Sequence, residues 1–310
     1  MRTRRIGQLE VSATGLGCNN FGMRCDEEQT AAVVAAALDA GVTFFDTADV
    51  YGGQGRSEEL LGRCLEGRRD EVVIATKVGA PMGGNGDRQG ASARWIATAV
   101  EDSLRRLGTD RIDLYQLHFP DQETPIDETL GALTELVQQG KVLEIGCSNF
   151  SSAQIEGADA AAGGKGTRFV SVQNEYSLLN RRPEKNVLPA CEARGLAFLP
   201  YFPLAHGLLT GKYTRGEAPP DGTRLAAMPE ERREQVMTED RLEVVERLAA
   251  FAAERGHTVA ELAFAWLLAH PPVASVIAGA TRPEQVRANA AASEWELSTA
   301  DLGEVDRLLG

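Results

Sequence analysis

The stretch Phe44-Phe-Asp-Thr-Ala-Asp-Val-Tyr-Gly52 joins a short apolar run to an acidic residue, a turn and a tyrosine. Short apolar runs bounded by turn residues are typical of buried strands. A similar order, in which an apolar strand ends at a reactive side chain, returns at Ile74-Ala-Thr-Lys77 and at Asp113-Leu-Tyr-Gln-Leu-His118. This repetition, more than any single motif, decides the fold that we predict.

Strand candidates of this kind alternate with helical patterns along the whole chain. They cover residues 14–18, 43–46, 72–76, 112–117, 142–147, 169–173, 197–201 and 275–278, after a hairpin of residues 4–7 and 10–13. Amphipathic helices are expected at 27–40, 92–107, 129–139, 239–255 and 259–269, and the second of these begins at a Ser92 cap and ends at Gly108. The alternation predicts parallel strands joined by crossover helices. We therefore expect an α/β fold, a (β/α)8 TIM barrel, as one domain over residues 1–310.

Composition excludes several classes of protein. With 45 acidic and 32 basic residues the net charge is −13, which opposes binding to nucleic acid or to anionic lipid. No apolar run approaches the roughly 18 residues of a membrane span. The basic start Met1–Arg5 is followed by Gly7-Gln-Leu-Glu10 rather than by the apolar core of a signal peptide. A cytoplasmic protein without membrane or nucleic-acid partners is expected.

The cysteines indicate neither a disulfide framework nor a metal site. They are odd in number and scattered, and no two of them form a CxxC pair: Cys18, Cys25, Cys64, Cys147 and Cys191. A structural zinc site normally needs closely spaced pairs of ligands. We therefore expect no metal and a reducing compartment.

The reactive residues fall at corresponding places in the predicted strands. The following lie at or just after a strand's C-terminal end: Asp46, Lys77, His118, Ser148, Asn149, Gln173 and Tyr201. In a (β/α)8 barrel these ends converge on one face, where barrel enzymes build their active sites. Taken singly, Asp46 could be a turn cap, Lys77 a solvated strand end and His118 a satisfied core histidine. Tyr51 could be an ordinary loop aromatic, and only the set as a whole favours a site.

Several motifs together resemble the aldo-keto reductase superfamily. Besides the three stretches quoted above, they are Gly146-Cys-Ser-Asn-Phe150, Val172-Gln-Asn-Glu-Tyr-Ser177, Tyr201-Phe-Pro-Leu204 and Gly207-Leu-Leu-Thr-Gly-Lys-Tyr213. The similarity spans nearly the whole chain and is closer to the bacterial and potassium-channel-β-like branches. It implies a barrel with an N-terminal hairpin and accessory helices, and a nicotinamide cofactor bound without a Rossmann fold. In agreement, the sequence contains no GxGxxG motif.

The resemblance implies a catalytic group of Asp46, Tyr51, Lys77 and His118. Hydride arriving at a carbonyl carbon leaves negative charge on oxygen, so a proton donor is needed there. Tyr51 is the expected donor, and its phenol would normally titrate near 10. An ammonium about 4 Å away contributes roughly 4 kcal/mol at an effective dielectric of about 20, so Lys77 is expected to lower that pKa, with desolvation working against it. Asp46 would pair with Lys77, and His118 would hydrogen-bond the substrate oxygen.

The same resemblance implies a set of cofactor-binding residues. Ser148, Asn149 and Gln173 match the polar group that holds the nicotinamide carboxamide, and Tyr201 matches the aromatic residue that stacks on the ring. Ordinary strand-end hydrogen bonding is the alternative for Asn149 and Gln173. Leu204, Gly207 and Lys212 match the segment near the pyrophosphate, although Lys212 could equally be a solvated surface charge.

The C-terminal stretch Gly279-Ala-Thr-Arg-Pro-Glu-Gln-Val-Arg-Ala-Asn289 matches the adenosine-phosphate segment, with Thr281, Gln285 and Asn289 as contacts. Gly279 stands where many members carry a lysine for the 2′-phosphate, and Ala280 replaces a serine. Arg282 can compensate, because a guanidinium can hold a phosphate with two hydrogen bonds, or it can be a surface charge beside a helix start. NADP(H) is therefore the expected cofactor and NAD(H) the alternative.

The function predicted on this basis is NADP(H)-dependent reduction of aldehydes or ketones to alcohols, with a small carbonyl compound as substrate. The alternative is a regulatory module that senses nicotinamide redox state, like channel β-subunits. The intact catalytic residues favour an enzyme, and such a regulator would be expected to carry an extended N-terminal arm, whereas the hairpin here begins almost at Met1. An aldolase with Lys77 as Schiff-base nucleophile would leave Tyr51, Gln173 and Tyr201 unexplained. Phe21, Phe119 and Phe202 suggest an apolar mouth, although each could equally be a packing residue, and the loops 79–90 and 213–239 could cover it.

Overall fold

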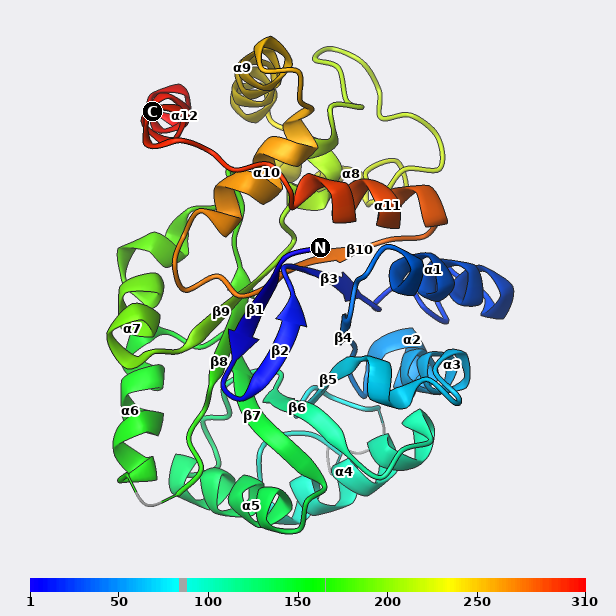
Figure 1. The fold of residues 1–310 in the computed structure, drawn as a ribbon, viewed down its shortest axis with the longest axis vertical. Coiled ribbons are helices and arrows are strands. Elements are labelled where there is room, and N and C mark those ends of the chain that lie inside the picture. Colours follow the sequence, from blue (N-terminus) through cyan, green and yellow to red (C-terminus); the bar gives the residue numbers. More distant parts are fainter. Residues whose placement is uncertain (84–87, 165) are drawn as a thin grey trace.

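Parallel strands form a barrel in the computed structural model, which describes residues 1–83, 88–164 and 166–310. Eight strands follow one another in the order β10-β3-β4-β5-β6-β7-β8-β9, with helices around the outside (Figure 1). The barrel closes where the Phe198 N–H of β9 donates to the Pro272 carbonyl, 2.7 Å away, just before β10. The predicted α/β TIM barrel is thus confirmed.

Strands and helices alternate through most of the chain. The strands are β1 (Thr3–Ile6), β2 (Leu9–Ser12), β3 (Thr14–Gly17), β4 (Phe44–Asp46), β5 (Val73–Val78), β6 (Ile112–Leu117), β7 (Val142–Ser148), β8 (Ser171–Glu175), β9 (Ala197–Tyr201) and β10 (Val276–Gly279). The helices are α1 (Glu27–Asp39), α2 (Tyr51–Gln54), α3 (Arg56–Cys64), α4 (Ala93–Leu107), α5 (Ile126–Gln138), α6 (Ser152–Ala162), α7 (Val187–Arg194), α8 (Glu230–Val236), α9 (Glu239–Glu254), α10 (Val259–Leu268), α11 (Pro283–Ala292) and α12 (Thr299–Leu309). Short 3-10 helices cover Arg69–Glu71, Arg182–Lys185 and Ala205–Thr210.

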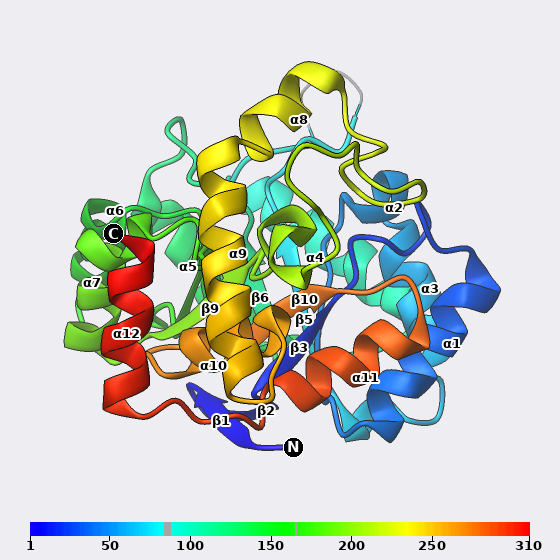
Figure 2. The same ribbon diagram turned by 90° about the horizontal axis from the view of Figure 1, so that it is seen from above.

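Two apolar layers hold these elements together. The hairpin of β1 and β2 places Ile6 and Val11 against Phe44, Ala75 and Leu114, which point into the barrel. The outward-facing strand residues pack instead against the surrounding helices. The hairpin lies at one end of the barrel, and α8 with its flanking loops lies at the other (Figure 2). Because the hairpin seals the first end with apolar residues, only the second can hold a polar site.

The predicted strands form, but two of them end two residues later than expected. The prediction ended one strand at Thr76, whereas β5 continues to Val78 because Lys77 pairs in register with Gln116 of β6. Gln173 likewise lies inside β8, which continues to Glu175. Lys77, expected just after its strand, is therefore a strand residue, and Gln173, expected as the last residue of its strand, lies in the middle of β8. Their orientation is fixed by the pleat of the sheet.

The helix predictions hold where capping residues are present. Ser92 caps α4 by accepting a hydrogen bond from the Trp95 N–H, and Gly108 ends it with a φ of 64°. The expected structureless segment 213–239 is wrong in part, because it contains α8, whose Val236 is buried. The other predicted loop, 79–90, includes residues 84–87, which lie outside the described residues.

Candidate active site

An ion pair between Asp46 and Lys77 forms the base of the candidate site. Asp46 ends β4 and Lys77 points inward from β5, and both side chains are buried. Lys77 Nζ lies 2.7 Å from Asp46 Oδ2 and 2.8 Å from the Thr47 carbonyl oxygen. Burial acts to lower the pKa of Lys77, but Asp46 and Tyr51 outweigh it and the pKa is raised. Lys77 is therefore held as a cation.

Two glutamines hold the second oxygen of Asp46. Gln173 donates to Oδ1 over 2.8 Å and Gln116 over 3.1 Å. The sequence reasoning missed Gln116, although its signal was present: it lies two residues before His118, on the same inward face of a strand. Glycine is favoured beside it at position 146, because a Cβ there would overlap the Ser171 hydroxyl and lie 3.2 Å from Gln116 Cγ. The Gln173 amide, expected to be available for a nicotinamide carboxamide, is engaged with Asp46.

Tyr51 lies above this ion pair, at the start of the helical turn α2. Its ring is partly exposed, with Lys77 Nζ 5.0 Å from the ring centroid. Burial raises the pKa of Tyr51, and the opposing effect of Lys77 does not overcome it. The expectation of a net lowered phenol pKa is therefore wrong for this structure. The physical reason is that a phenolate loses more hydration here than one ammonium restores.

His118 follows β6 and faces Tyr51. The two ring centroids are 5.6 Å apart with an interplanar angle of 80°. Burial, with a smaller effect of Lys77, lowers the pKa of His118 to about 3, so its imidazole is neutral near neutral pH. Its Nδ1 is buried and has no hydrogen-bond partner in the described part of the chain. Phe119 stacks on it at 4.8 Å and is 49% exposed.

A belt of hydrogen bonds joins the ends of β6, β7 and β9. The Tyr201 hydroxyl donates to Asn149 Oδ1 over 2.8 Å, and Asn149 Nδ2 donates to the His118 carbonyl over 3.0 Å. Asn149 Nδ2 also donates to Ser148 Oγ over 3.1 Å, while Ser148 Oγ donates to the Gln173 carbonyl. Asn149 adopts a φ of 63°, a left-handed conformation in which asparagine is favoured. The structure thus brings the predicted carboxamide group together.

The segment after β9 is tightly wound. Phe202, Ala205 and His206 have φ values of 51°, 46° and 59°. Left-handed conformations in residues other than glycine cost energy and cluster at functional sites. Leu204 and Gly207 lie in this segment, and a Cβ on Gly207 would lie 3.5 Å from Lys212 Nζ.

Arg224 is a second residue that sequence reasoning missed. Its guanidinium lies 5.4 Å from the Phe202 ring centroid, and burial together with the neighbouring Arg24 lowers its pKa. Neither arginine forms an ion pair within the described ranges, and the same is true of Lys212. Arg24 and Arg224 are therefore neighbouring cations, without ion pairs among the described residues, in a chain of net charge −13. Nothing in the sequence distinguished Arg224 from the other residues of its loop.

The C-terminal segment leads from β10 into α11, whose N-terminus has no side-chain cap. The Thr281 N–H donates to Gln285 Oε1 over 2.8 Å. Gln285 and Asn289 lie one turn apart on the same helix, while Arg282 is exposed. At Gly279 a Cβ would lie 3.1 Å from Asn20 Nδ2 and 3.2 Å from Asn19 Oδ1. These asparagines occupy the space that a side chain at Gly279 would need.

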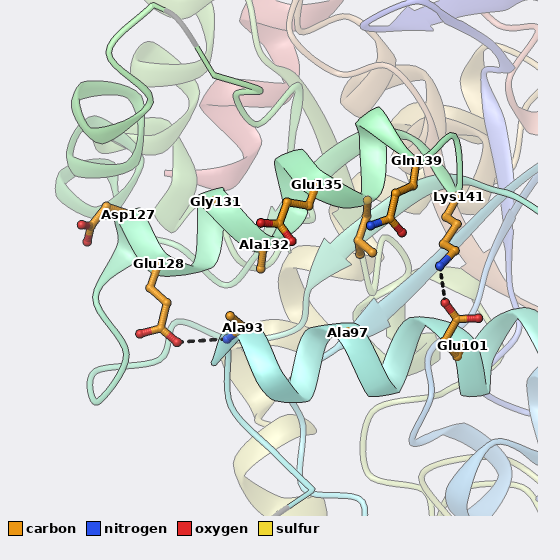
Figure 3. Close-up of a pocket in the computed structure, with 11 residues that line it drawn as sticks. Ala93, Ala97, Glu101, Asp127, Glu128, Gly131, Ala132, Glu135, Gln139 and Lys141 are labelled. Carbon is orange, nitrogen blue, oxygen red and sulfur yellow. Dashed lines mark hydrogen bonds and ion pairs between the residues drawn. The ribbon is translucent and has the colours of Figure 1, made fainter.

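A separate surface pocket of about 390 Å³ lies between α4 and α5 (Figure 3). Its lining includes Ala93, Ala97, Glu101 and Lys141, none of which belongs to the candidate site. Phe21, expected at an apolar mouth, is fully buried in the outer core, so that expectation is wrong. Over the described residues, no helix is both long and apolar enough to cross a membrane.

A model of the Aldo/keto reductase family matches residues 13–309. The chain belongs to the aldo/keto reductase family. It is 39% identical to the uncharacterized oxidoreductase YrpG of Bacillus subtilis, over 93% of this chain and 89% of that protein. It is 35% identical to a probable voltage-gated potassium channel subunit beta of Oryza sativa, over 93% and 90%. The structure of the glycerol dehydrogenase AKR11B4 from Gluconobacter oxydans matches with a TM-score of 0.85 and 32% identity, over 99% and 94%.

Membership of the aldo/keto reductase family makes the chain an oxidoreductase that acts on a small molecule. Aldo/keto reductases generally use nicotinamide cofactors.

Proposed function

We propose that the chain reduces aldehydes or ketones to alcohols with NADP(H), and that Tyr51 is the general acid. The observation that carries this proposal is the buried Asp46–Lys77 ion pair, with Nζ and Oδ2 2.7 Å apart, beneath the partly exposed Tyr51 ring. The neutral His118 faces the same ring. A carbonyl oxygen placed between Tyr51 and His118 would meet two hydrogen-bond donors.

Each residue then has a distinct task in the reaction. Reduced nicotinamide supplies the hydride when it is bound at this face. Tyr51 gives its proton to the substrate oxygen as negative charge develops there. Lys77 stabilises the resulting phenolate, which matters because burial otherwise disfavours that anion. Asp46 keeps Lys77 charged and aimed, and His118 orients the oxygen without carrying charge.

The residues at this face fit a dinucleotide phosphate. Arg224 and Lys212 are cations without carboxylate partners among the residues the structure describes, and they flank the segment that contains Leu204 and Gly207. At the start of α11, Pro283 has no N–H and the Gln285 N–H already donates to the Arg282 carbonyl, so the Glu284 N–H is what this helix end would offer an anion. We assign Ser148, Asn149, Gln173 and Tyr201 to the nicotinamide end, and Thr281, Gln285 and Asn289 to the adenosine end. When the cofactor binds, the hydrogen bond from Tyr201 to Asn149 is either kept or replaced by a hydrogen bond to the cofactor.

The preference for NADP(H) depends on Arg282. This exposed guanidinium lies at the N-cap of α11 and forms no ion pair in the described part of the structure. It can grip a 2′-phosphate from the position next to the helix start. Gly279 contributes no side chain, so NAD(H) is the alternative cofactor. The scattered free cysteines agree with a reducing compartment, and we place the enzyme in the cytoplasm.

The test is a turnover screen of aldehydes and ketones with NADPH and NADH, read by loss of the reduced-nicotinamide absorbance. Intrinsic fluorescence titration gives both affinities in parallel. We expect turnover, with tighter binding of NADPH than of NADH. Tight cofactor binding with no turnover on any carbonyl would favour the redox-sensing alternative, to which the similarity to a channel β-subunit points. Failure to bind either cofactor would overturn both.

A further inference from the structure

Asp49 is a buried carboxyl group that the reaction does not use. It lies two residues before Tyr51, its relative exposure is 1%, and neither of its side-chain oxygens has a hydrogen-bond partner within the described residues. An ionised carboxylate without partners is among the most costly groups to bury. The backbone around it is well ordered by hydrogen bonds, so the position is not a loosely packed surface. The state of this group therefore needs an explanation.

The charged groups near Asp49 are already paired with other residues. From α3, Glu58 accepts from Arg106 of α4 over 2.6 Å and from the Thr76 hydroxyl over 2.5 Å. From β5, Lys77 is paired with Asp46. From β6, Tyr115 presents a buried hydroxyl that has no partner in the described ranges. Burial, and then Glu58, raise the pKa of Asp49 to about 8, against the smaller opposing effects of Arg106, of the nearby Val50 backbone N–H and of Lys77.

Tyr115 is a neutral neighbour of Asp49. After burial, the charge of Asp49 has the largest effect on the Tyr115 hydroxyl, so the two groups are neighbours. No hydrogen bond joins them among the described residues, and a phenol hydroxyl carries no charge that could balance a carboxylate. A carboxylate can only accept, and it would face Glu58 with no cation left to balance it. The surroundings are thus built for the protonated form.

The backbone at Asp49 connects this group to the catalytic residues. The Asp49 N–H donates to the Lys77 carbonyl over 3.2 Å, and the Thr47 N–H donates to the Ala75 carbonyl over 2.8 Å. Lys77 Nζ in turn donates to the Thr47 carbonyl. Residues 47–49 therefore lie along β5, and the chain reaches Tyr51 directly afterwards. A shift of Asp49 would move Tyr51 relative to Lys77.

We propose that Asp49 is a positioning residue that works as the neutral acid, holding the segment before Tyr51 against β5, and that loss of its proton displaces Tyr51 from Lys77. The inference rests on the proposed role of Tyr51. It predicts an alkaline fall in kcat that belongs to Asp49 rather than to the substrate. The fall should begin near pH 8 and reach about tenfold one pH unit higher, as for loss of a single essential proton.

The experiment compares kcat at pH 7 and pH 9.5 within each of three proteins: wild type, Asp49→Asn and Asp110→Asn. Asparagine mimics the neutral acid in size and charge. Asp110 is exposed and distant from the site, so its variant is the control. We expect the fall between the two pH values to be at least about tenfold smaller in Asp49→Asn than in wild type, and unchanged in the control. The same alkaline fall in Asp49→Asn as in wild type would overturn the proposal.

Thermal unfolding supplies a readout that does not depend on catalysis. A raised carboxyl pKa means that the folded state keeps a proton that the unfolded chain releases above about pH 4, so stability falls as pH rises from about 4 to 8. The Tm of Asp49→Asn should therefore gain on wild type across this window. If that gain appears but the kcat profiles coincide, Asp49 is buried as an acid yet does not position Tyr51. If Asp49→Asn does not fold, Asp49→Leu, which also lacks the charge, takes its place in both measurements.

Discussion

Replacing Tyr51 by phenylalanine removes the proposed general acid with the least disturbance. The change deletes one oxygen and keeps the ring, whose centroid lies 5.6 Å from that of His118 and 5.0 Å from Lys77 Nζ. No cofactor-binding candidate hydrogen-bonds to this phenol among the described residues. Removing a positioned general acid typically costs about 10² to 10⁴ in rate, or roughly 3 to 5.5 kcal/mol. We expect kcat to fall in that range while NADPH affinity is preserved.

Lys77→Met tests the same mechanism by removing the cation instead of the phenol. It leaves the Tyr51 phenolate without its nearest cation and should cost kcat a comparable factor. It also leaves Asp46 buried with only Gln116 and Gln173 as donors, so we expect a loss of about 3 to 5 kcal/mol in the free energy of unfolding. Tyr51→Phe should lose far less stability. The double mutant should be far from additive in kcat, because the two residues act as a unit.

The assay is single-turnover loss of reduced-nicotinamide absorbance on the best substrate found. A deuterium isotope effect with labelled NADPH establishes that hydride transfer limits the rate, and fluorescence titration reports cofactor affinity. If Tyr51→Phe then retains nearly the wild-type kcat, the assignment of Tyr51 as proton donor is refuted. Loss of NADPH binding in Tyr51→Phe would show instead that the phenol belongs to the cofactor site.

Other substitutions test neighbouring parts of the site. His118 has a lowered pKa of about 3, so its contribution to stability is present above the unfolded value near 6.5 and lost as pH falls toward 3. His118→Phe should therefore flatten the acid limb of the unfolding free energy, and an unchanged limb would contradict the burial argument. Arg282→Ala should weaken NADPH binding about tenfold, or about 1.4 kcal/mol, and leave NADH nearly unchanged; equal losses by fluorescence titration would exclude a 2′-phosphate contact. Gln116→Leu removes one hydrogen bond to the buried Asp46 carboxylate and should lower the free energy of unfolding by about 1.5 to 3 kcal/mol. Urea titration measures this change, and an unaltered unfolding midpoint would count against that hydrogen bond.

The sequence predicted those features that are encoded over short distances. Periodicity located the strands, because side-chain alternation and apolar length are properties of a few neighbouring residues. Ser92 and Gly108 marked the ends of α4, since capping is satisfied within one helical turn. The family motifs then named Asp46, Tyr51, Lys77 and His118 as candidates. All four lie at one end of the barrel, as the shared strand polarity requires.

Only the tertiary structure decided what these residues contact. Gln116 and Gln173 reach Asp46 from 70 and 127 residues away, and barrel register alone sets which inward side chains share a layer. The direction of the pKa change at Tyr51 also depended on tertiary structure, because desolvation is summed over every element packed around the ring. The burial of Asp49, whose oxygens have no hydrogen-bond partner among the described residues, likewise could not be read from the sequence. The local sequence pattern determines on which strand or helix a residue lies. Its burial and its long-range partners are determined only once the strands have closed into a barrel.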